Sequence, residues 1–120
     1  MTGRHRSFDS NPLGQYVLGG PDGHTPIAEP DLLTWGRWMQ GADVERMVEF
    51  TGNEGQFVST VFLGLDHNFF GGGPPLVFET MVFGGAQDGA QERYSTWAEA
   101  EAGHRAMCLL VFGKALERQT

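Results

Sequence analysis

The chain has 120 residues, which suits one domain with a hydrophobic core that needs no disulfides. Fifteen acidic against eight basic residues give a net charge of −7, which argues against a non-specific nucleic-acid binder because such a protein needs a basic face. A single cysteine, Cys108, excludes an internal disulfide and a multi-thiolate zinc site. We find no signal peptide and no apolar run of the roughly 18 residues that a membrane span needs, so we expect a cytoplasmic protein without membrane contact.

The N-terminal part of the chain is rich in polar and turn-forming residues. Residues 1–15 lack periodicity, and we expect a flexible arm there, followed by a single domain over residues 16–120. The segment YVLG (16–19) favours a short strand, and GGPDGHTP (19–26) predicts a turn. His24 lies in this turn, where it is either exposed to solvent or part of a ligand-binding or catalytic site.

A helix is predicted over about residues 30–41. Proline suits the first turn of a helix, and the acidic residues on either side of Pro30 complement the helix dipole there. Arg37 projects from a polar face and is a candidate for anion binding. The apolar side chains recur at helical spacing and form one stripe, made of Leu32, Trp35, Trp38 and Met39. The two tryptophans are interpreted as core anchors or, for one of them, as a stacking surface for a planar ligand.

Strands are predicted next. The segment VERMVEF (44–50) alternates, so Val48 and Phe50 should share one face of a strand. A turn then leads into a central hairpin with arms at about residues 56–65 and 76–83, rich in β-branched and aromatic residues. Both faces of this hairpin are largely apolar, which predicts that it is covered on both sides or lies in a subunit interface, so we expect a homo-oligomer.

The C-terminal part predicts a short edge strand and a long helix. QERYS (91–95) is the candidate strand. Thr96 and Glu99 have the spacing of a capping box, and an apolar face continues to about residue 117. His104 lies on that face, as a hydrogen-bonded structural residue or a functional one. The predicted class is α+β, with an antiparallel sheet of about three to five strands and two helices, at about 30–41 and 96–117.

The loop that joins the arms of the hairpin is the main candidate site. Its residues DHNFFGGGPP (66–75) combine groups that shape tight turns with two adjacent phenylalanines. Glu79, in the second arm, has apolar neighbours and therefore needs a partner or takes up a proton. Together with the helix 30–41 and the edge strand, this defines the candidate ligand-binding residues: Asp66, His67, Asn68, Phe69, Phe70, Glu79, Trp35, Arg37 and Arg93.

Three kinds of chemistry are compatible with these residues. The glycines, with arginines and aromatic rings nearby, could bind a nucleotide-like ligand. If the protein is an enzyme, Glu79 and His67 are the acid–base pair, with His104 as the other candidate histidine. A metal site could be drawn from Asp66, His67, Glu79 and His24, but nothing in the spacing fixes its geometry, so we expect neither a metal nor a cofactor.

Three segments also carry a resemblance to a known group. VSTVFLGLDHNF, GGGPPLVFETMVFGG and ERYSTWAEAEAGH resemble a family of small uncharacterised proteins encoded by tailed phages and prophages, and PDGHTPIAEPDLLTWGRWM is similar to the family's opening. The resemblance covers about residues 20–104. It implies a phage accessory protein in the bacterial host cytoplasm that interferes with host functions such as defence, and it supplies no catalytic or cofactor-binding residue.

The function expected from these observations is binding rather than catalysis. The first hypothesis is capture of a small, nucleotide-like ligand near residues 66–75. The second is an acidic inhibitor that blocks a basic surface of a host protein. The third is a small enzyme that uses Glu79 and a histidine.

Overall fold

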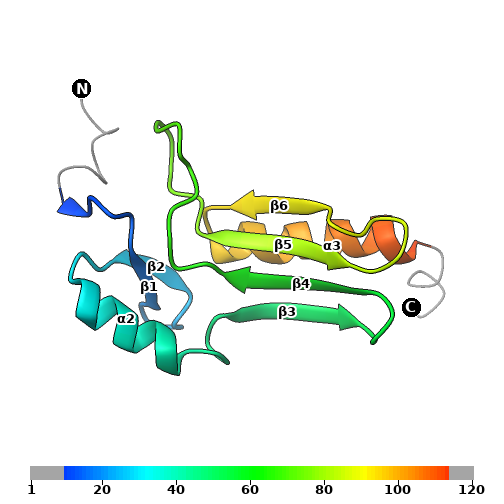
Figure 1. The fold of residues 1–120 in the computed structure, drawn as a ribbon, viewed down its shortest axis with the longest axis horizontal. Coiled ribbons are helices and arrows are strands. Elements are labelled where there is room, and N and C mark those ends of the chain that lie inside the picture. The colour runs from blue at the N-terminus through cyan, green and yellow to red at the C-terminus, as the bar shows by residue number, and fades with distance from the viewer. Residues whose placement is uncertain (1–9, 114–120) are drawn as a thin grey trace.

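The computed structural model describes residues 10–113. Within this range, four strands form an antiparallel meander in the order β3-β4-β5-β6, and a separate two-stranded sheet pairs β1 with β2. Helix α3 lies behind the larger sheet in Figure 1, and α2 lies beside the small sheet. The predicted α+β class, with an antiparallel sheet and two helices, is confirmed. The elements are β1 (Tyr16–Gly19), β2 (Thr25–Ala28), α2 (Leu32–Gly41), β3 (Met47–Gly52), β4 (Phe57–Phe62), β5 (Phe78–Phe83), β6 (Gln91–Tyr94) and α3 (Trp97–Phe112).

The predicted central hairpin is the pair β4–β5. The two strands align over six residue pairs, from Phe57 opposite Phe83 to Phe62 opposite Phe78. Side chains alternate between two sides of the sheet, as strand geometry requires. The inner face, which packs against α3, carries six side chains that are at most 1% exposed: Val58, Thr60, Phe62, Phe78, Thr80 and Val82. The outer face carries Met47, Phe50, Phe57, Ser59, Val61, Glu79, Met81, Phe83, Gln91 and Arg93.

Strand β3 departs from the alternation that its sequence predicts. Residues 44–46 form a turn, and the strand begins only at Met47. The register then shifts between Met47 and Glu49, as at a β-bulge. As a result Val48 packs against the core, whereas Phe50 pairs with Ser59 on the outer face. The prediction that Val48 and Phe50 share one face is therefore wrong, because one irregular residue reverses the alternation that follows it.

Helix α3 begins with the predicted capping box. The Thr96 hydroxyl accepts from the Glu99 amide at 3.0 Å, and the Glu99 carboxylate accepts from the Thr96 amide at 3.3 Å. Its buried residues, Ala100, His104, Met107 and Cys108, recur at helical spacing on the predicted apolar face. The helix ends at Phe112, and the predicted continuation over residues 114–117 lies outside the described residues.

The N-terminal part of the fold contains a strand that the turn-rich sequence hides. Residues 19–26 do hold a turn, but Thr25 and Pro26 already belong to β2, which pairs with β1. Helix α2 begins at Leu32, and the Asp31 carboxylate caps it by accepting from the Thr34 amide at 2.9 Å. Two hydrogen bonds lower the pKa of the Asp31 carboxyl group: the one from the Thr34 hydroxyl has the larger effect, and the one from the Thr34 amide has the smaller.

The predicted arm of residues 1–15 lies largely outside the described residues, but its last part belongs to the fold. Asn11 and Gln15 are each 1% exposed. The Asn11 side-chain amide donates to the Gln15 carbonyl at 2.6 Å, and the Gln15 side chain donates to the Glu29 carbonyl at 2.9 Å. Residues 11–15 are therefore not a flexible arm, because buried amides with hydrogen-bond partners hold them in place.

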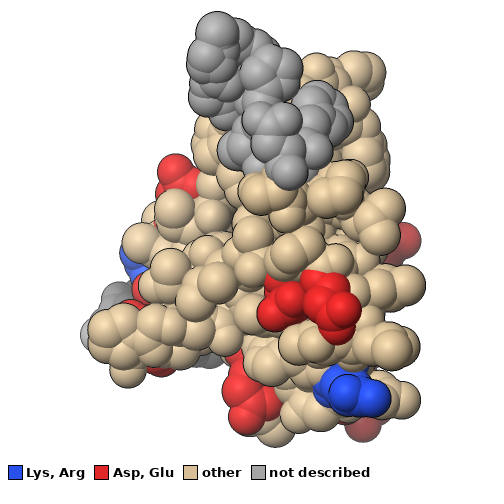
Figure 2. Space-filling model, turned by 90° about the vertical axis from the view of Figure 1, so that its left-hand side faces the viewer, with Lys and Arg blue, Asp and Glu red and all other residues tan. Residues whose placement is uncertain are grey.

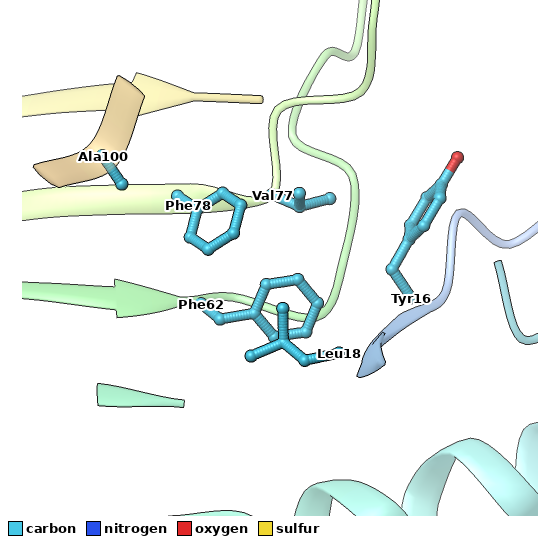
Figure 3. Packing of buried hydrophobic residues seen from close by; sticks show 6 residues of the cluster. All are labelled: Tyr16, Leu18, Phe62, Val77, Phe78 and Ala100. Carbon is cyan, nitrogen blue, oxygen red and sulfur yellow. The ribbon is translucent and has the colours of Figure 1, made fainter. Parts of the chain in front are cut away.

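The core has two apolar clusters on the inner side of the sheet. In the first, the rings of Phe62 and Phe78 lie between the sheet, Ala100 of α3 and Leu18 of β1 (Figure 3). The second joins Val58, Val82, Met107 and Cys108. Both clusters occupy one side of the sheet, so its outer face has no described helix or strand packed on it.

Candidate functional site

The loop between β4 and β5 projects past the end of the sheet (Figure 1). Its base continues the antiparallel pairing beyond the strands, because the Leu63 amide donates to the Val77 carbonyl at 2.7 Å and the His67 amide to the Leu76 carbonyl at 2.9 Å. The Asp66 amide donates to the Gly14 carbonyl at 2.9 Å, which ties the loop to the segment before β1. The sheet and the N-terminal segment therefore hold the base of the loop from two sides.

Two side chains predicted to bind a ligand instead shape this loop. The Asp66 carboxylate accepts from the amides of Asn68 and Leu76, at 2.8 and 2.9 Å, and so bridges the two sides of the loop. The Asn68 side-chain amide donates to the carbonyls of Gly72 and Pro74, at 2.5 and 3.2 Å. Both residues have the structural role of Asx-type turn formers that the sequence allows.

The tip of the loop presents its aromatic side chains to solvent. Phe70 is 100% exposed and Phe69 is 74% exposed. His67 sits below them, with its Nδ1 atom 2.9 Å from the Leu65 carbonyl and its ring centroid 5.4 Å from that of Phe69. The three glycines that follow all have positive φ, between 69° and 73°, a conformation that other residues rarely adopt.

Trp35 anchors α2 to the base of the loop. Its indole N–H donates to the carbonyls of Tyr16 and Gly64, both at 3.1 Å. Trp38, one turn later, packs edge-on against Phe62 with centroids 5.9 Å apart. Both tryptophans thus have the anchoring role predicted for them, and the N–H of Trp35 is already used within the protein.

Glu79 and Arg93 form an ion pair on the outer face of the sheet. The Arg93 Nε donates to a Glu79 carboxylate oxygen at 3.0 Å, across the β5–β6 pair. The Glu79 side chain is 14% exposed and that of Arg93 is 33% exposed. The partner that this partly buried carboxylate requires is therefore the arginine in the next strand.

Arg37 lies on α2, away from these groups. It lines an open hollow of about 420 Å³. The other residues around this hollow, all from the same helix, are Leu32, Leu33, Trp35, Gly36 and Gln40. Of the nine predicted site residues, the five from Asp66 to Phe70 lie together in one loop, and Trp35 lies against the base of that loop. Glu79 and Arg93 pair with each other on the sheet, and Arg37 lies apart from both on α2.

The candidate histidines occupy three separate environments. The ring of His24 stacks on Trp97 at the start of α3, with centroids 3.6 Å apart and planes 1° from parallel. His104 is 1% exposed, and its two ring nitrogens lie 2.7 Å from the Thr60 hydroxyl and 2.9 Å from the Thr51 hydroxyl. His67 is on the loop. Among residues 10–113, no three histidine, cysteine or acidic side chains are grouped to hold a metal ion.

The His104 contacts belong to a buried polar network inside the core. The Thr60 hydroxyl also lies 2.6 Å from that of Thr80, directly opposite it in the next strand. Burial lowers the pKa of His104; the field of Glu49 opposes this shift and that of Arg105 adds to it. His104 thus has the hydrogen-bonded structural position that was one of the two alternatives predicted for it. Cys108 is a buried core residue near His104, and burial raises the pKa of its thiol.

Sequence reasoning missed the aromatic cluster on the outer face. Phe57 stacks between Phe50 and Phe83, with centroid distances of 4.9 and 4.7 Å. Phe50 is 52% exposed and Phe83 is 40% exposed. The apolar outward residues of the hairpin did signal such a surface, but Phe50 joins it only through the register shift in β3.

Acidic groups are spread over the end of the molecule that contains α2 and the small sheet. Figure 2 shows this end, where uncharged residues cover most of the surface and acidic side chains are separated by them. Residues 16–46 contain five acidic and two arginine side chains and no lysine. Residues 16–46 therefore carry a net negative charge.

The fold and its projecting loop define a small α+β protein with an antiparallel meander that one helix covers on one face. The chain has no match among protein-family models, curated proteins or solved structures. In the part of the chain that the structure describes, the helices are too short or too polar to span a bilayer.

Proposed function

We propose that this protein acts by binding another protein, with the tip of the 66–75 loop as its recognition element. The observation that carries the proposal is the complete exposure of Phe70, beside the largely exposed Phe69, on a loop of defined shape. Phenylalanine in water is unfavourable by about 1.5–3 kcal/mol relative to a buried site, so a partner pocket that accepts these rings gains affinity from them.

The order of the loop supports recognition. Asp66 and Asn68 bind backbone groups on both sides of the loop, and the Leu63–Val77 and His67–Leu76 hydrogen bonds close its base. A loop that is ordered before binding loses less conformational entropy when a partner engages it. The aromatic tip is therefore presented at little entropic cost.

The charge of the chain indicates the kind of surface that would receive the tip. A net charge of −7 favours a partner with a basic rim, because opposite potentials steer the encounter of two proteins. An apolar pocket within a basic surface of a bacterial host protein fits both features. This agrees with the phage accessory role in the host cytoplasm that the sequence resemblance implies, and with interference in host defence or regulation.

A nucleotide-like ligand at the same loop has less support. Arg93 is already paired with Glu79, Arg37 lies on α2, and the Trp35 N–H is bonded to backbone carbonyls. Catalysis has less support for a related reason. Glu79 is held by Arg93 on the sheet, and the Nδ1 of His67 contacts a backbone carbonyl.

The proposal is tested by affinity capture from bacterial lysate with three baits at matched concentration. These are the natural chain, the double variant Phe69→Ser/Phe70→Ser, and the control Leu33→Ser, which alters an apolar residue on α2 that is 68% exposed. A partner that the natural chain and the control retain, and that the loop variant loses, is then purified. Titration calorimetry should give a Kd at least about tenfold weaker for the loop variant, and weaker still as salt rises.

Two results would count against this function. One is equal capture by all three baits, which would assign binding to another surface. The other is tight binding of a nucleotide or cyclic nucleotide in a calorimetric panel together with the absence of a protein partner, which would favour the small-ligand hypothesis.

A further inference from the structure

The outer face of the four-stranded sheet is apolar although no described element covers it. In antiparallel sheets with one wet face, the wet side is normally polar. Here the central strands direct Phe57, Val61, Met81 and Phe83 to this side, and β3 adds Phe50. The three phenylalanine rings stack on one another, so the exposed apolar area is contiguous. Contiguous patches of this kind mark interaction sites.

Among residues 10–113, the side chains on the same face carry no net charge. Its two charged groups, Glu79 and Arg93, neutralise each other at 3.0 Å. The other acidic residues of these strands are Glu49 and Glu92. They lie opposite Thr60 and Thr80 in the sheet and therefore share the inner face with these threonines. In a chain of net charge −7, the outer face is therefore a region where a second negatively charged molecule can approach without local repulsion.

From these two observations we propose that the outer face binds a second copy of this chain, sheet against sheet, around a two-fold axis. A self-associating face must be complementary to itself, which a neutral apolar face is. A basic protein would find no net negative charge on it, and a nucleic acid would find no net positive charge, because Glu79 and Arg93 are paired with each other. The interface is separate from the loop tip, which projects past the strand ends and leaves the face open (Figure 1).

The size of the face sets the expected strength of the dimer. With strands about 4.8 Å apart and about 3.4 Å per residue, four strands of about six residues cover roughly 400 Å² in projection. The relief of the side chains increases this area, and stable interfaces bury about 600–800 Å² on each partner. The face thus fits the low end of specific interfaces, and we expect a dimer that dissociates at roughly micromolar concentration.

Sedimentation velocity of the full chain between about 1 and 200 µM tests the proposal, since this range brackets the expected Kd. The average mass should rise from that of the monomer towards twice that value. Added salt should leave the dimer unchanged or strengthen it, because screening reduces the repulsion between two acidic chains.

Two face variants and one control identify the surface. Phe50→Thr/Phe83→Thr removes two exposed rings while keeping β propensity, and it should weaken dimerisation at least about tenfold. Ser59→Arg puts a like charge near the centre of the face in both copies and should give a monomer across the range. The control Leu110→Gln alters an apolar residue of α3 that is 59% exposed and should dimerise like the natural chain.

Circular dichroism of each variant verifies that the fold is retained before its mass is interpreted. A monomer for the natural chain at all concentrations would overturn the proposal. So would a dimer that both face variants retain, or one that only Leu110→Gln weakens, because the contact would then lie elsewhere on the molecule.

Discussion

The two faces of the four-stranded sheet are made from alternate residues of the same strands, yet they differ in what covers them. On β5 the inner residues Phe78, Thr80 and Val82 are at most 1% exposed, whereas Phe83 on the outer face is 40% exposed. The inner face meets α3, with which all four strands are in contact. The outer face meets no described element. Apolar character alone therefore does not tell which face forms the core.

Polar groups mark the difference more clearly than apolar ones. On the inner face, the hydroxyls of Thr60 and Thr80 are buried and bonded to each other and to His104. On the outer face, the charged groups form an ion pair that remains partly exposed. A buried polar group needs its partners within the protein, and on the inner face Thr60, Thr80 and His104 supply partners to one another.

The largest expected effect comes from removing one ring from each face of the same strand. Phe78→Ala should lower the free energy of unfolding by about 3–5 kcal/mol, because it leaves a cavity in the first core cluster. Phe83→Ala should lower it by less than about 1 kcal/mol, since its ring is already partly in water. Urea denaturation at submicromolar protein, where the monomer prevails, measures both values. Similar losses for the two variants would mean that the outer face is also buried in the monomer.

The buried network makes the inner face sensitive to pH. The folded-state pKa of His104 lies below its ordinary value of 6.5 because burial disfavours the charged ring. The unfolded chain therefore binds more protons between these two pKa values, and stability is fully present above pH 6.5 and falls as pH drops towards the folded pKa. The loss is at most about 1.4 kcal/mol per pH unit for this one group.

Denaturation curves between pH 8 and pH 5 test this dependence in the natural chain and in His104→Gln. The variant should be less stable at pH 8 and should show a smaller decline towards pH 5. Its amide retains hydrogen-bonding capacity without titrating. Parallel declines in the two proteins would assign the pH dependence to other groups.

A smaller effect distinguishes two helical glycines. A Cβ at Gly103 would lie 2.1 Å from the Tyr94 hydroxyl oxygen, so the α3–β6 contact requires a glycine there. Gly103→Ala should destabilise the protein by about 1–3 kcal/mol through overpacking. Gly36 in α2 has no atom within 4 Å of such a Cβ, and Gly36→Ala should stabilise it by about 0.5–1 kcal/mol through helix propensity.

Thermal melts of the two alanine variants give opposite shifts if α3 and the sheet are packed as closely as described. Stabilisation by Gly103→Ala would show that Tyr94 can move aside without cost. It would then follow that β6 is held loosely against the helix.

Local patterns were sufficient for much of the fold. The central hairpin, the edge strand and the capping box at Thr96 were all predicted from residue type and short spacing, because the interactions that form them involve near neighbours in the chain. Neither strand β2 nor the register of β3 was predicted. β2 forms only because β1 lies beside it, and the shift after Met47 depends on its pairing with β4.

The candidate site divides in the same way. Within the loop, Asp66 and Asn68 were identified correctly as residues that shape a turn, since their partners lie two to ten positions away. For Glu79, the sequence predicted only that the carboxylate needs a partner or takes up a proton, and it did not identify that partner. Its identity as Arg93 follows from the register of β5 with β6, which no local pattern states.

By itself, the sequence determined the α+β class, the hairpin with its stiff aromatic loop and the two helices, because alternation, caps and turn residues act over a few positions. Only the tertiary structure decided that α3 packs on the Thr60 side of the sheet, that His104 joins the threonines there, and that the Phe57 side stays open. The physical reason is that both sides are apolar enough to be buried. The choice between them depends on polar partners and close packing contributed by segments far away in the chain.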